Sequence, residues 1–355
     1  MKVFKKLLLT LAILLGAVLL AAAALFTWLT ITEFRPEAQE AVAVEQQVDR
    51  LLQNTEDFTV LSWNIGYCGL GRESDFFMDG GETVRSDEEL VAKNLAGVRE
   101  LLSGRKADFT LLQEVDSDSR RSYGIDQTAE LRAVEARASA YAMNFSAGFV
   151  PYPWPPIGKV HSGLLTLSGC SVAEATRISL PCPFSWPVSI VNLKRCLLVT
   201  RVPISGSEKE LVLVNLHLEA YDDGEGKLAQ SRQLREFVER EYEKGNYVVA
   251  GGDWNQLFPE TEAVYPNTHP ELWIPGYLDE KELAEGWQYV WDDAVPSCRL
   301  LNQPYDPADR AGTQYYVIDG FLVSPNLKVK AVETLDEGFA YSDHNPVLLT
   351  LSMGE

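Results

Sequence analysis

The chain has 355 residues and a formal net charge of −20, from 51 acidic and 31 basic side chains. Proteins that bind a nucleic-acid backbone normally carry dense Lys/Arg patches, because phosphate neutralisation supplies much of their affinity. The sequence has no dense Lys/Arg cluster, and Arg120-Arg121 and Lys194-Arg195 are isolated pairs. This weighs against nucleic acid as the main substrate, although basic residues far apart in the sequence could still share one face.

Residues 7–31 form an uncharged apolar run that follows Lys2, Lys5 and Lys6. As a helix rising ~1.5 Å per residue, this run is long enough to cross a hydrocarbon core of ~30 Å. Basic residues before the span favour a cytoplasmic N-terminus. We therefore predict a single-pass protein of the cell membrane, with residues 1–6 as a basic cytoplasmic tail, residues 7–31 as a signal anchor and the catalytic domain extracytoplasmic. The alanines at 21–24 leave a second interpretation open, a cleaved signal peptide.

Residues 32–56 are polar, acidic and rich in helix formers, so we interpret them as a juxtamembrane stalk. Residues 57–355 are expected to form one catalytic domain, because the polar motifs described below are spread over that length. The five cysteines are too few and too irregularly spaced for a disulfide framework or a zinc site. Cys170 and Cys182 could nevertheless pair in an exported domain.

Two amphipathic helices are predicted between apolar strands. Ser86-Asp87-Glu88-Glu89 resembles a capping box, with Ser86 as the N-cap, and Gly104 is expected to end the helix. The second helix is expected to end at Gly245. The apolar positions of the two helices recur at helical spacing: Leu90, Val91, Leu95, Val98, Leu101 and Leu102 in the first, and Leu228, Leu234, Phe237, Val238 and Tyr242 in the second. Strands alternating with helices predict an α/β protein.

Short polar motifs follow the apolar strands at their ends. They are Ser62-Trp63-Asn64, Gln113-Glu114, Asn215-Leu216-His217-Leu218, Gly252-Asp253-Trp254-Asn255, Ile318-Asp319-Gly320 and Ser342-Asp343-His344. Carboxylate and amide oxygens placed at one rim of a sheet suit a hard divalent cation such as Mg²⁺. The two imidazoles add groups that titrate near neutral pH. These motifs together predict a metal-assisted hydrolase.

The same motifs, in this order from about Asp57 to Leu351, resemble those of the endonuclease/exonuclease/phosphatase superfamily. The resemblance implies a deoxyribonuclease I-like fold, a two-layer sandwich of mixed β-sheets flanked by helices (α/β or α+β). It also implies a phosphoesterase that depends on Mg²⁺ or Mn²⁺. The superfamily includes deoxyribonucleases, inositol polyphosphate phosphatases and neutral sphingomyelinases, which share only a phosphate-ester substrate.

The resemblance assigns metal-binding roles to four residues. Glu114 is expected to be the principal ligand, with Asn64 close to the metal and phosphate. Asp253 is expected to hold the metal or align the attacking water, and Asp343 to be a further carboxylate of the metal site.

Catalytic roles follow from the same resemblance. His344 is expected to be the general base, oriented by Asp319. His217 is expected either to stabilise the transition state or to protonate the leaving group, with Asn255 binding a phosphoryl oxygen and Asn215 supporting the site. Two residues apart in a strand, Asp253 and Asn255 are expected to share a face. His161 is a further, weaker candidate for substrate contact, and an ordinary loop histidine is the favoured interpretation.

The substrate itself stays open between a phospholipid, a nucleic acid and a small phosphoester. Residues 149–156 and 184–187 are rich in aromatics and proline, and could contact a membrane interface or pack as rigid loops on the protein. Residues 312–319 lack the Trp-Cys-Asp-Arg motif typical of inositol phosphatases. We expect a monomer, and two alternatives remain: a secreted or surface nuclease of the same fold, and a membrane-tethered binding module without catalysis.

Overall fold

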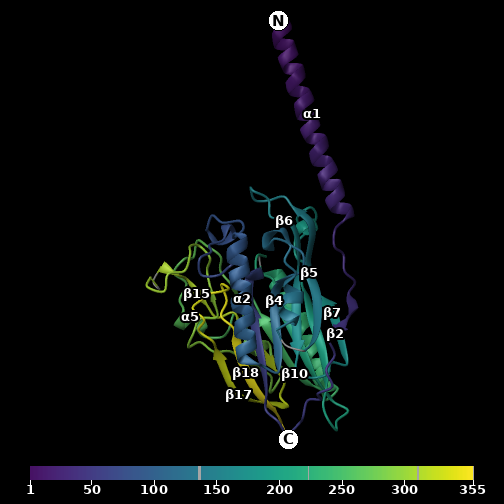
Figure 1. Cartoon of the computed structure of the whole chain (residues 1–355), viewed down its shortest axis with the longest axis vertical. Helices are drawn as coiled ribbons and strands as arrows, with labels where there is room; N and C mark the ends of the chain where they lie inside the picture. Colours follow the sequence, from purple (N-terminus) through teal and green to yellow (C-terminus); the bar gives the residue numbers. More distant parts are fainter. Residues whose placement is uncertain (135–136, 223, 310–311, 355) are drawn as a thin grey trace.

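In a computed structural model of the chain, two seven-stranded mixed β-sheets pack face to face with helices outside them, and a long helix projects from one end (Figure 1). The structure describes residues 1–134, 137–222, 224–309 and 312–354. This arrangement confirms the predicted two-layer sandwich.

The first sheet has the order β1-β7-β8-β9-β10-β16-β13. Its strands are β1 (Gln39–Val42), β7 (Glu174–Ser179), β8 (Cys196–Pro203), β9 (Glu210–His217), β10 (Tyr247–Asp253), β16 (Asp319–Val323) and β13 (Gln288–Val290). The second sheet has the order β17-β18-β3-β4-β6-β5-β2. Its strands are β17 (Leu327–Thr334), β18 (Val347–Met353), β3 (Phe58–Asn64), β4 (Phe109–Asp116), β6 (Gly158–Ser168), β5 (Ala138–Val150) and β2 (Val44–Glu45).

Helices and short ladders complete the described fold. The α-helices are α1 (Lys2–Ile31), α2 (Glu88–Arg105), α3 (Gln127–Arg132), α4 (Glu225–Glu243) and α5 (Thr261–Val264). The 3₁₀ turns are η1 (Gly66–Cys68), η2 (Phe77–Asp79), η3 (Arg120–Ser122), η4 (Val188–Val191) and η5 (Glu280–Glu282). The two-stranded ladders pair β11 (Gln256–Leu257) with β12 (Gly276–Tyr277), and β14 (Cys298–Arg299) with β15 (Tyr315–Tyr316).

Three apolar layers hold the sandwich together. Residues from both sheets, among them Phe58, Leu111, Leu213 and Phe321, form the layer between the sheets. The outer layers lie under α2 on the second sheet and under α4 on the first. Burial of these alternating strand faces accounts for the two-sheet architecture.

The ends of the two long helices differ in part from the prediction. Asp87, not Ser86, caps α2, with its side chain accepting from the Leu90 N–H at 2.8 Å. Ser86 is buried and donates to the carbonyl of Gly69 instead. Gly104 lies inside α2, which ends where Lys106 adopts a left-handed φ of +47°. The predicted end of α4 at Gly245 agrees with its positive φ of +86°.

Residues 32–56 differ more strongly from the predicted helix-prone stalk. β1 pairs antiparallel with β7 and β2 pairs antiparallel with β5, so one segment forms the edge of both sheets. Leu52 is buried in the layer between the sheets and bridges to Ile204. The segment therefore belongs to the folded domain, because its apolar positions and backbone groups complete both sheet edges.

Helix α1 is the described helix with the length and apolar composition to cross a membrane, and a signal sequence passes the same test. Its last turn is held against the domain. The ring of Trp28 lies close to Gly148 of β5, Trp186 donates from Nε1 to Thr30 Oγ1 at 3.1 Å, and Lys194 pairs with Glu33 at 2.8 Å.

One end of the sandwich gathers most strand ends that carry polar motifs. β3 and β4 are parallel, as are β9 and β10, so their C-terminal ends lie together. The 151–157 connection between β5 and β6 lies at this end, because Asp116 at the end of β4 pairs with Ser162 near the start of β6. Helix α1 leaves the domain there (Figure 1).

Candidate active site

A cavity of about 640 Å³ opens where the C-terminal ends of β3, β4, β9 and β10 meet. It is lined by seven of the predicted site residues, namely Asn64, Glu114, His217, Asp253, Asn255, Asp343 and His344. Asn64, Glu114, His217 and Asp253 lie at or near these strand ends. Asp343 and His344 precede β18 instead of following a strand, which corrects the prediction, and they reach the same rim because the start of β18 pairs with Ser62 of β3.

Asp253 lies at the centre of the polar floor. Its Oδ2 accepts from Asn64 Nδ2 at 2.9 Å and lies 3.4 Å from His217 Nε2 and 3.8 Å from His344 Nε2. Asn64 also donates to Glu114 Oε1 at 3.2 Å. One amide therefore bridges two carboxylates that come from different sheets.

The backbone around Glu114 is irregular. The register between β4 and β6 shifts between Leu112 and Val115, and Glu114 has a φ of +54°. A β-bulge turns a side chain in a new direction and interrupts the hydrogen bonding between the two strands. A non-glycine residue in the left-handed backbone conformation adds local strain. Here the bulge turns the Glu114 carboxylate toward Asn64.

Asp253 and Asn255 reach the cavity by a turn rather than by strand alternation, which corrects the prediction. β10 ends at Asp253, and Asn255 has a φ of +52°. The Asn255 N–H donates to Asp253 Oδ1, and its side chain donates to the carbonyl of Leu218, both at 2.9 Å. This turn fixes both side chains.

His344 is held by Asp319 as the resemblance implied. His344 Nδ1 lies 2.8 Å from Asp319 Oδ2, which also accepts from Ser297 Oγ at 2.8 Å. Trp63 Nε1 donates to the His344 carbonyl at 2.8 Å. Asp319 begins β16 instead of following a strand, and it meets Asp253 because β16 runs antiparallel to β10.

Burial and neighbouring charge perturb the acids of the floor. Burial and the charge of Asp319 raise the pKa of Asp253 to about 6. Burial and the charge of Glu114 raise the pKa of Asp343 to about 7. Clustered buried carboxylates with raised pKa values mark a functional site that lacks enough positive charge.

The pKa values of His217 and His344 are shifted in opposite directions. Burial and the nearby Arg195 guanidinium lower the pKa of His217 well below its usual value, so its imidazole is neutral at pH 7. Burial also opposes protonation of His344, but the carboxylates around it, Asp319 foremost, outweigh burial and raise its pKa well above the usual value.

Three candidates lie outside the cavity lining. Asn215 sits deeper between the sheets, accepting from Gln113 Nε2 at 2.8 Å and donating to the carbonyls of Leu112 and Leu165. His161 lies in β6, where its backbone exchanges hydrogen bonds with Ser119. Asp319 is buried behind His344.

Cationic and phenolic residues of the site were missed from the sequence. Arg121 pairs with Asp116 at 2.9 Å and stacks over Tyr67 at 3.7 Å from the ring centroid. Arg195 pairs with Glu219 at 3.2 Å. All of these except Asp116 line the cavity. The two basic pairs were visible in the sequence, but nothing in it placed them at one rim.

The donor set fits a hard divalent cation. The carboxylates of Glu114, Asp253 and Asp343 and the amide of Asn64 supply oxygen ligands of the kind that Mg²⁺ and Mn²⁺ prefer. Asp253, Asp319 and His344 also offer ligand atoms within 4.8 Å of one another. We favour the oxygen set, because Asp319 already holds the imidazole of His344 by hydrogen bonding.

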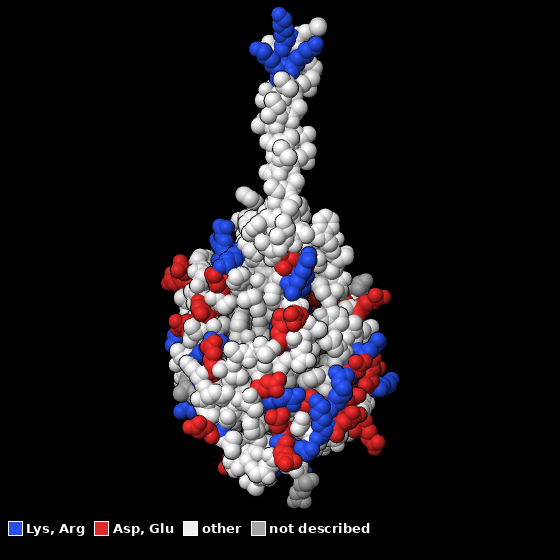
Figure 2. Space-filling model, turned by 90° about the vertical axis from the view of Figure 1, so that its right-hand side faces the viewer, with Lys and Arg blue, Asp and Glu red and all other residues white. Residues whose placement is uncertain are grey.

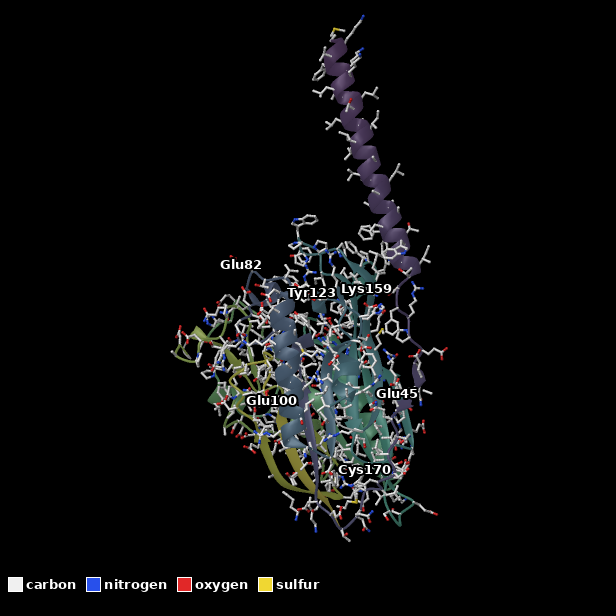
Figure 3. The ribbon with its side chains drawn as sticks, in the orientation of Figure 1. Glu45, Glu82, Glu100, Tyr123, Lys159 and Cys170 are labelled. Atoms are coloured by element: carbon white, nitrogen blue, oxygen red, sulfur yellow. The ribbon has the colours of Figure 1, made fainter. Side chains whose placement is uncertain are left out.

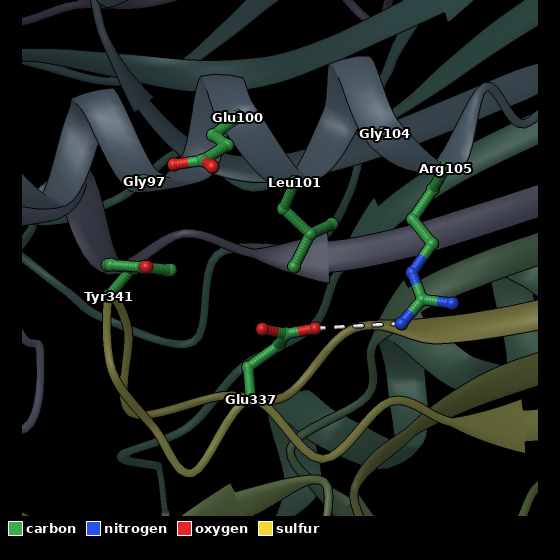
Figure 4. Close-up of a pocket in the computed structure, with 7 residues that line it drawn as sticks. All are labelled: Gly97, Glu100, Leu101, Gly104, Arg105, Glu337 and Tyr341. Carbon is green, nitrogen blue, oxygen red and sulfur yellow. Dashed lines mark ion pairs between the residues drawn. The ribbon is translucent and has the colours of Figure 1, made fainter.

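A smaller hollow of about 380 Å³ lies between α2 and the segment around Glu337 and Tyr341 (Figure 4). Arg105 and Glu337 face each other across it at 3.8 Å. Its lining, as far as the chain is described, brings no histidine, cysteine or amide group together. We therefore assign no chemistry to it.

A family model described as the Endonuclease/Exonuclease/phosphatase family matches residues 61–344. The chain belongs to this family. The match spans every predicted motif from the end of β3 to His344, which confirms the resemblance read from the sequence. No curated protein matches the chain significantly in sequence.

Solved structures of the endonuclease/exonuclease/phosphatase family share the fold at low identity. The endonuclease/exonuclease/phosphatase from Beutenbergia cavernae DSM 12333 is 18% identical, with a TM-score of 0.57 over 84% of this chain and 72% of that one. ANGEL2, described as a 2',3'-cyclic phosphatase, is 15% identical, with a TM-score of 0.55 over 88% and 98%. TDP2 of D. rerio in complex with a single-strand DNA product is 17% identical, with a TM-score of 0.51 over 84% and 100%.

Proposed function

We propose that this protein is a membrane-anchored phosphoesterase that uses a divalent cation, Mg²⁺ or Mn²⁺, and a histidine-activated water. The observation that carries the proposal is the convergence of Asn64, Glu114, Asp253 and Asp343 beside the paired His344 and Asp319. A binding module without catalysis has no need for an oriented imidazole at a carboxylate cluster.

His344 is the base in this proposal. Because Nδ1 donates to Asp319, Nε2 is the nitrogen that faces Asp253. Asp253 and Asp343 contribute to the raised pKa of His344, so a cation held by these carboxylates would lower that pKa and leave Nε2 neutral, able to take the proton of a water molecule. The water oxygen bonds to phosphorus as the ester P–O bond breaks, and the leaving oxygen takes up one proton to become an alcohol. Asp319 stabilises the imidazolium that forms at His344.

His217 acts in this proposal as a neutral hydrogen-bond donor to a phosphoryl oxygen. Its lowered pKa favours this role over protonation of the leaving group, the two roles left open by the sequence. Asn255 donates from the neighbouring turn. Both groups are fixed before substrate binds, which is the form of electrostatic stabilisation that contributes most to catalysis.

Glu114, Asp253 and Asp343 would hold the cation, with Asn64 beside them. A bound divalent cation there supplies a Lewis acid for the phosphoryl oxygens. The lysines in the first two turns of α1, before the uncharged run, support an anchor with a cytoplasmic N-terminus and the domain on the outer side of the membrane.

The test is hydrolysis by the purified full chain in detergent. The substrates are p-nitrophenyl phosphate, bis(p-nitrophenyl) phosphate and plasmid DNA, with Mg²⁺, Mn²⁺ or EDTA. We expect turnover of a phosphate ester only with added cation, and Glu114→Gln should lower cation affinity and rate together. Undiminished turnover after thorough metal removal would refute metal dependence. Strong preference for plasmid DNA would favour the nuclease alternative.

A further inference from the structure

We propose that the cavity opens onto the bilayer surface and that its substrate is a membrane phospholipid, with the phosphate on the polar floor and the acyl chains along an apolar wall. This inference rests on the proposed function, because it names the substrate class of the same site. It follows from where the anchor, the cavity and the exposed aromatic residues lie relative to one another.

The anchor and the catalytic floor lie at the same end of the domain. His217 ends β9, and its neighbour Leu216 pairs with Leu197 at the start of β8. The β7–β8 connection that precedes β8 carries Trp186 and Lys194, which bind the last turn of α1 and Glu33. Lys159, at the start of β6, lies toward α1, while Cys170 lies at the far end (Figure 3).

The orientation of the domain is constrained by these contacts. Leu29 at the end of α1 is buried, and Glu33 has a side-chain exposure of only 9%. The end of β5, which leads into the 151–157 connection, and the 180–195 connection both contact the last turns of α1. A helix spanning a bilayer would therefore bring both connections to the lipid surface.

The wall of the cavity that faces this end is apolar. It is formed by η2, the end of β5 and the two connections, and includes Phe77, Val150, Tyr152, Ile157, Phe184 and Val191. The opposite side of the same cavity carries the carboxylates and histidines described above. A soluble phosphoester needs only the polar side, whereas a phospholipid matches both.

The rim outside the cavity exposes large apolar side chains. Trp154 is 88% exposed, Trp186 is 62% exposed and Val188 is 52% exposed. The surface where α1 joins the domain is largely uncharged, and acidic side chains become frequent farther from the helix (Figure 2). Tryptophan is favoured at the membrane–water interface, and an exposed apolar patch marks a contact surface.

The first experiment compares two substrates for one protein. Full-chain protein is reconstituted with Mg²⁺ into vesicles of phosphatidylcholine and phosphatidylglycerol, and lipid products are measured beside hydrolysis of bis(p-nitrophenyl) phosphate. Trp154→Ser/Val188→Ser should lower phospholipid turnover about tenfold, since two apolar groups leave the interface, and keep the soluble turnover within about twofold. Leu51→Ser, an exposed apolar residue at the far end, is the matched control and should change neither rate.

The second experiment locates the rim directly. Cys182 is the exposed cysteine and the other four are buried, so Trp154→Cys in a Cys182→Ser background gives one reactive thiol for a nitroxide label. In the same vesicles the label should be more accessible to oxygen than to a water-soluble nickel chelate. A label at Ser207→Cys, on the distant β8–β9 turn, should show the reverse.

The outcomes separate the two proposals. Soluble-ester hydrolysis without phospholipid turnover overturns the inference and leaves the phosphoesterase in place, as does a water-exposed label at position 154. Absence of turnover on every substrate with either cation overturns the phosphoesterase itself.

Discussion

The 2.8 Å contact between His344 and Asp319 can be tested by a double-mutant cycle. General bases contribute about 10²–10⁴-fold in rate, so His344→Ala should lose at least about a hundredfold in kcat. Asp319→Asn should resemble it, and the double variant should be little worse than either, because residues acting as a unit are not additive. His269→Ala is the control, because the His269 side chain pairs with Glu271 in a loop away from the cavity. Fully additive losses would mean that the two side chains act separately.

The raised pKa of Asp343 predicts a stability cost in the metal-free protein. Between about pH 4 and 7 the folded carboxyl keeps a proton that the unfolded chain has released, so the free energy of unfolding falls as pH rises. In EDTA at pH 7.5, Asp343→Asn should therefore melt at least about 2 °C above wild type. Mg²⁺ should raise the melting temperature of wild type and not of the variant.

Thermal unfolding at pH 5.5 and 7.5, with EDTA or Mg²⁺, measures this effect. Identical pH dependence of the two proteins would show that Asp343 is ionised at no cost in the fold.

Single residues also show what the sequence could predict about the site. Glu114 and Asp253 were identifiable because their motifs lie at the ends of apolar strands, and His344 because its motif lies directly before the apolar strand β18. The β4 bulge that orients Glu114 and the turn at Asn255 could not be predicted from the sequence. Both have a positive φ at a residue other than glycine, so the sequence gives no local sign of the unusual backbone. Arg121 and Tyr67 meet only through tertiary packing, which no local pattern encodes.

At the scale of the elements, Gly252 and Gly104 predict opposite effects of a glycine-to-alanine substitution on stability. Gly252 has a φ of +152°, and a Cβ there would lie 1.9 Å from the Leu216 carbonyl oxygen. Gly104 lies within α2 with open space around it. Gly252→Ala should destabilise the domain by several kcal/mol, because β9 and β10 must separate. Gly104→Ala should instead stabilise it by about 0.5–1 kcal/mol.

Chemical denaturation of both variants measures these changes. A destabilised Gly104→Ala would support the original prediction that Gly104 ends the helix.

Strand existence was easier to predict than strand pairing. β3, β4, β9 and β10 are continuous apolar runs, as expected for strands buried on both faces. β1 and β2 are short, acidic and half-exposed, so their composition favours a helix or a linker, and only their partners β7 and β5 make them strands. Tertiary packing also extends α2 past Gly104, because the apolar face of the helix packs on the second sheet.

For the whole molecule, the position of residues 32–56 predicts which truncation folds. A domain beginning at residue 32 retains β1, β2 and Leu52, whereas one beginning at residue 57 leaves two open sheet edges and a vacated core position. Loss of one buried leucine lowers the free energy of unfolding by about 2–5 kcal/mol, and the loss of the β1 and β2 pairings lowers it further. Residues 57–355 should therefore be insoluble or melt well below residues 32–355. Equal melting temperatures would show that the segment is dispensable.

Topology is the second prediction at this scale. With a cytoplasmic N-terminus, protease added to intact cells should digest the domain and leave a short anchored fragment. Protection until lysis would place the domain inside, and release of intact domain into the medium would indicate signal-peptide cleavage.

The double edge formed by β1 and β2 also sets an order of assembly during synthesis. These strands leave the ribosome on the order of a hundred residues before β5 and β7, their partners. Until β5 and β7 have been synthesised, β1 and β2 remain unpaired beside the membrane. β5 and β7 are made before β8, β9, β10, β16 and β18, so this side of both sheets can pair before the rest of the first sheet has been synthesised. A chain stalled before β5 would leave both β1 and β2 unpaired and able to pair with neighbouring chains.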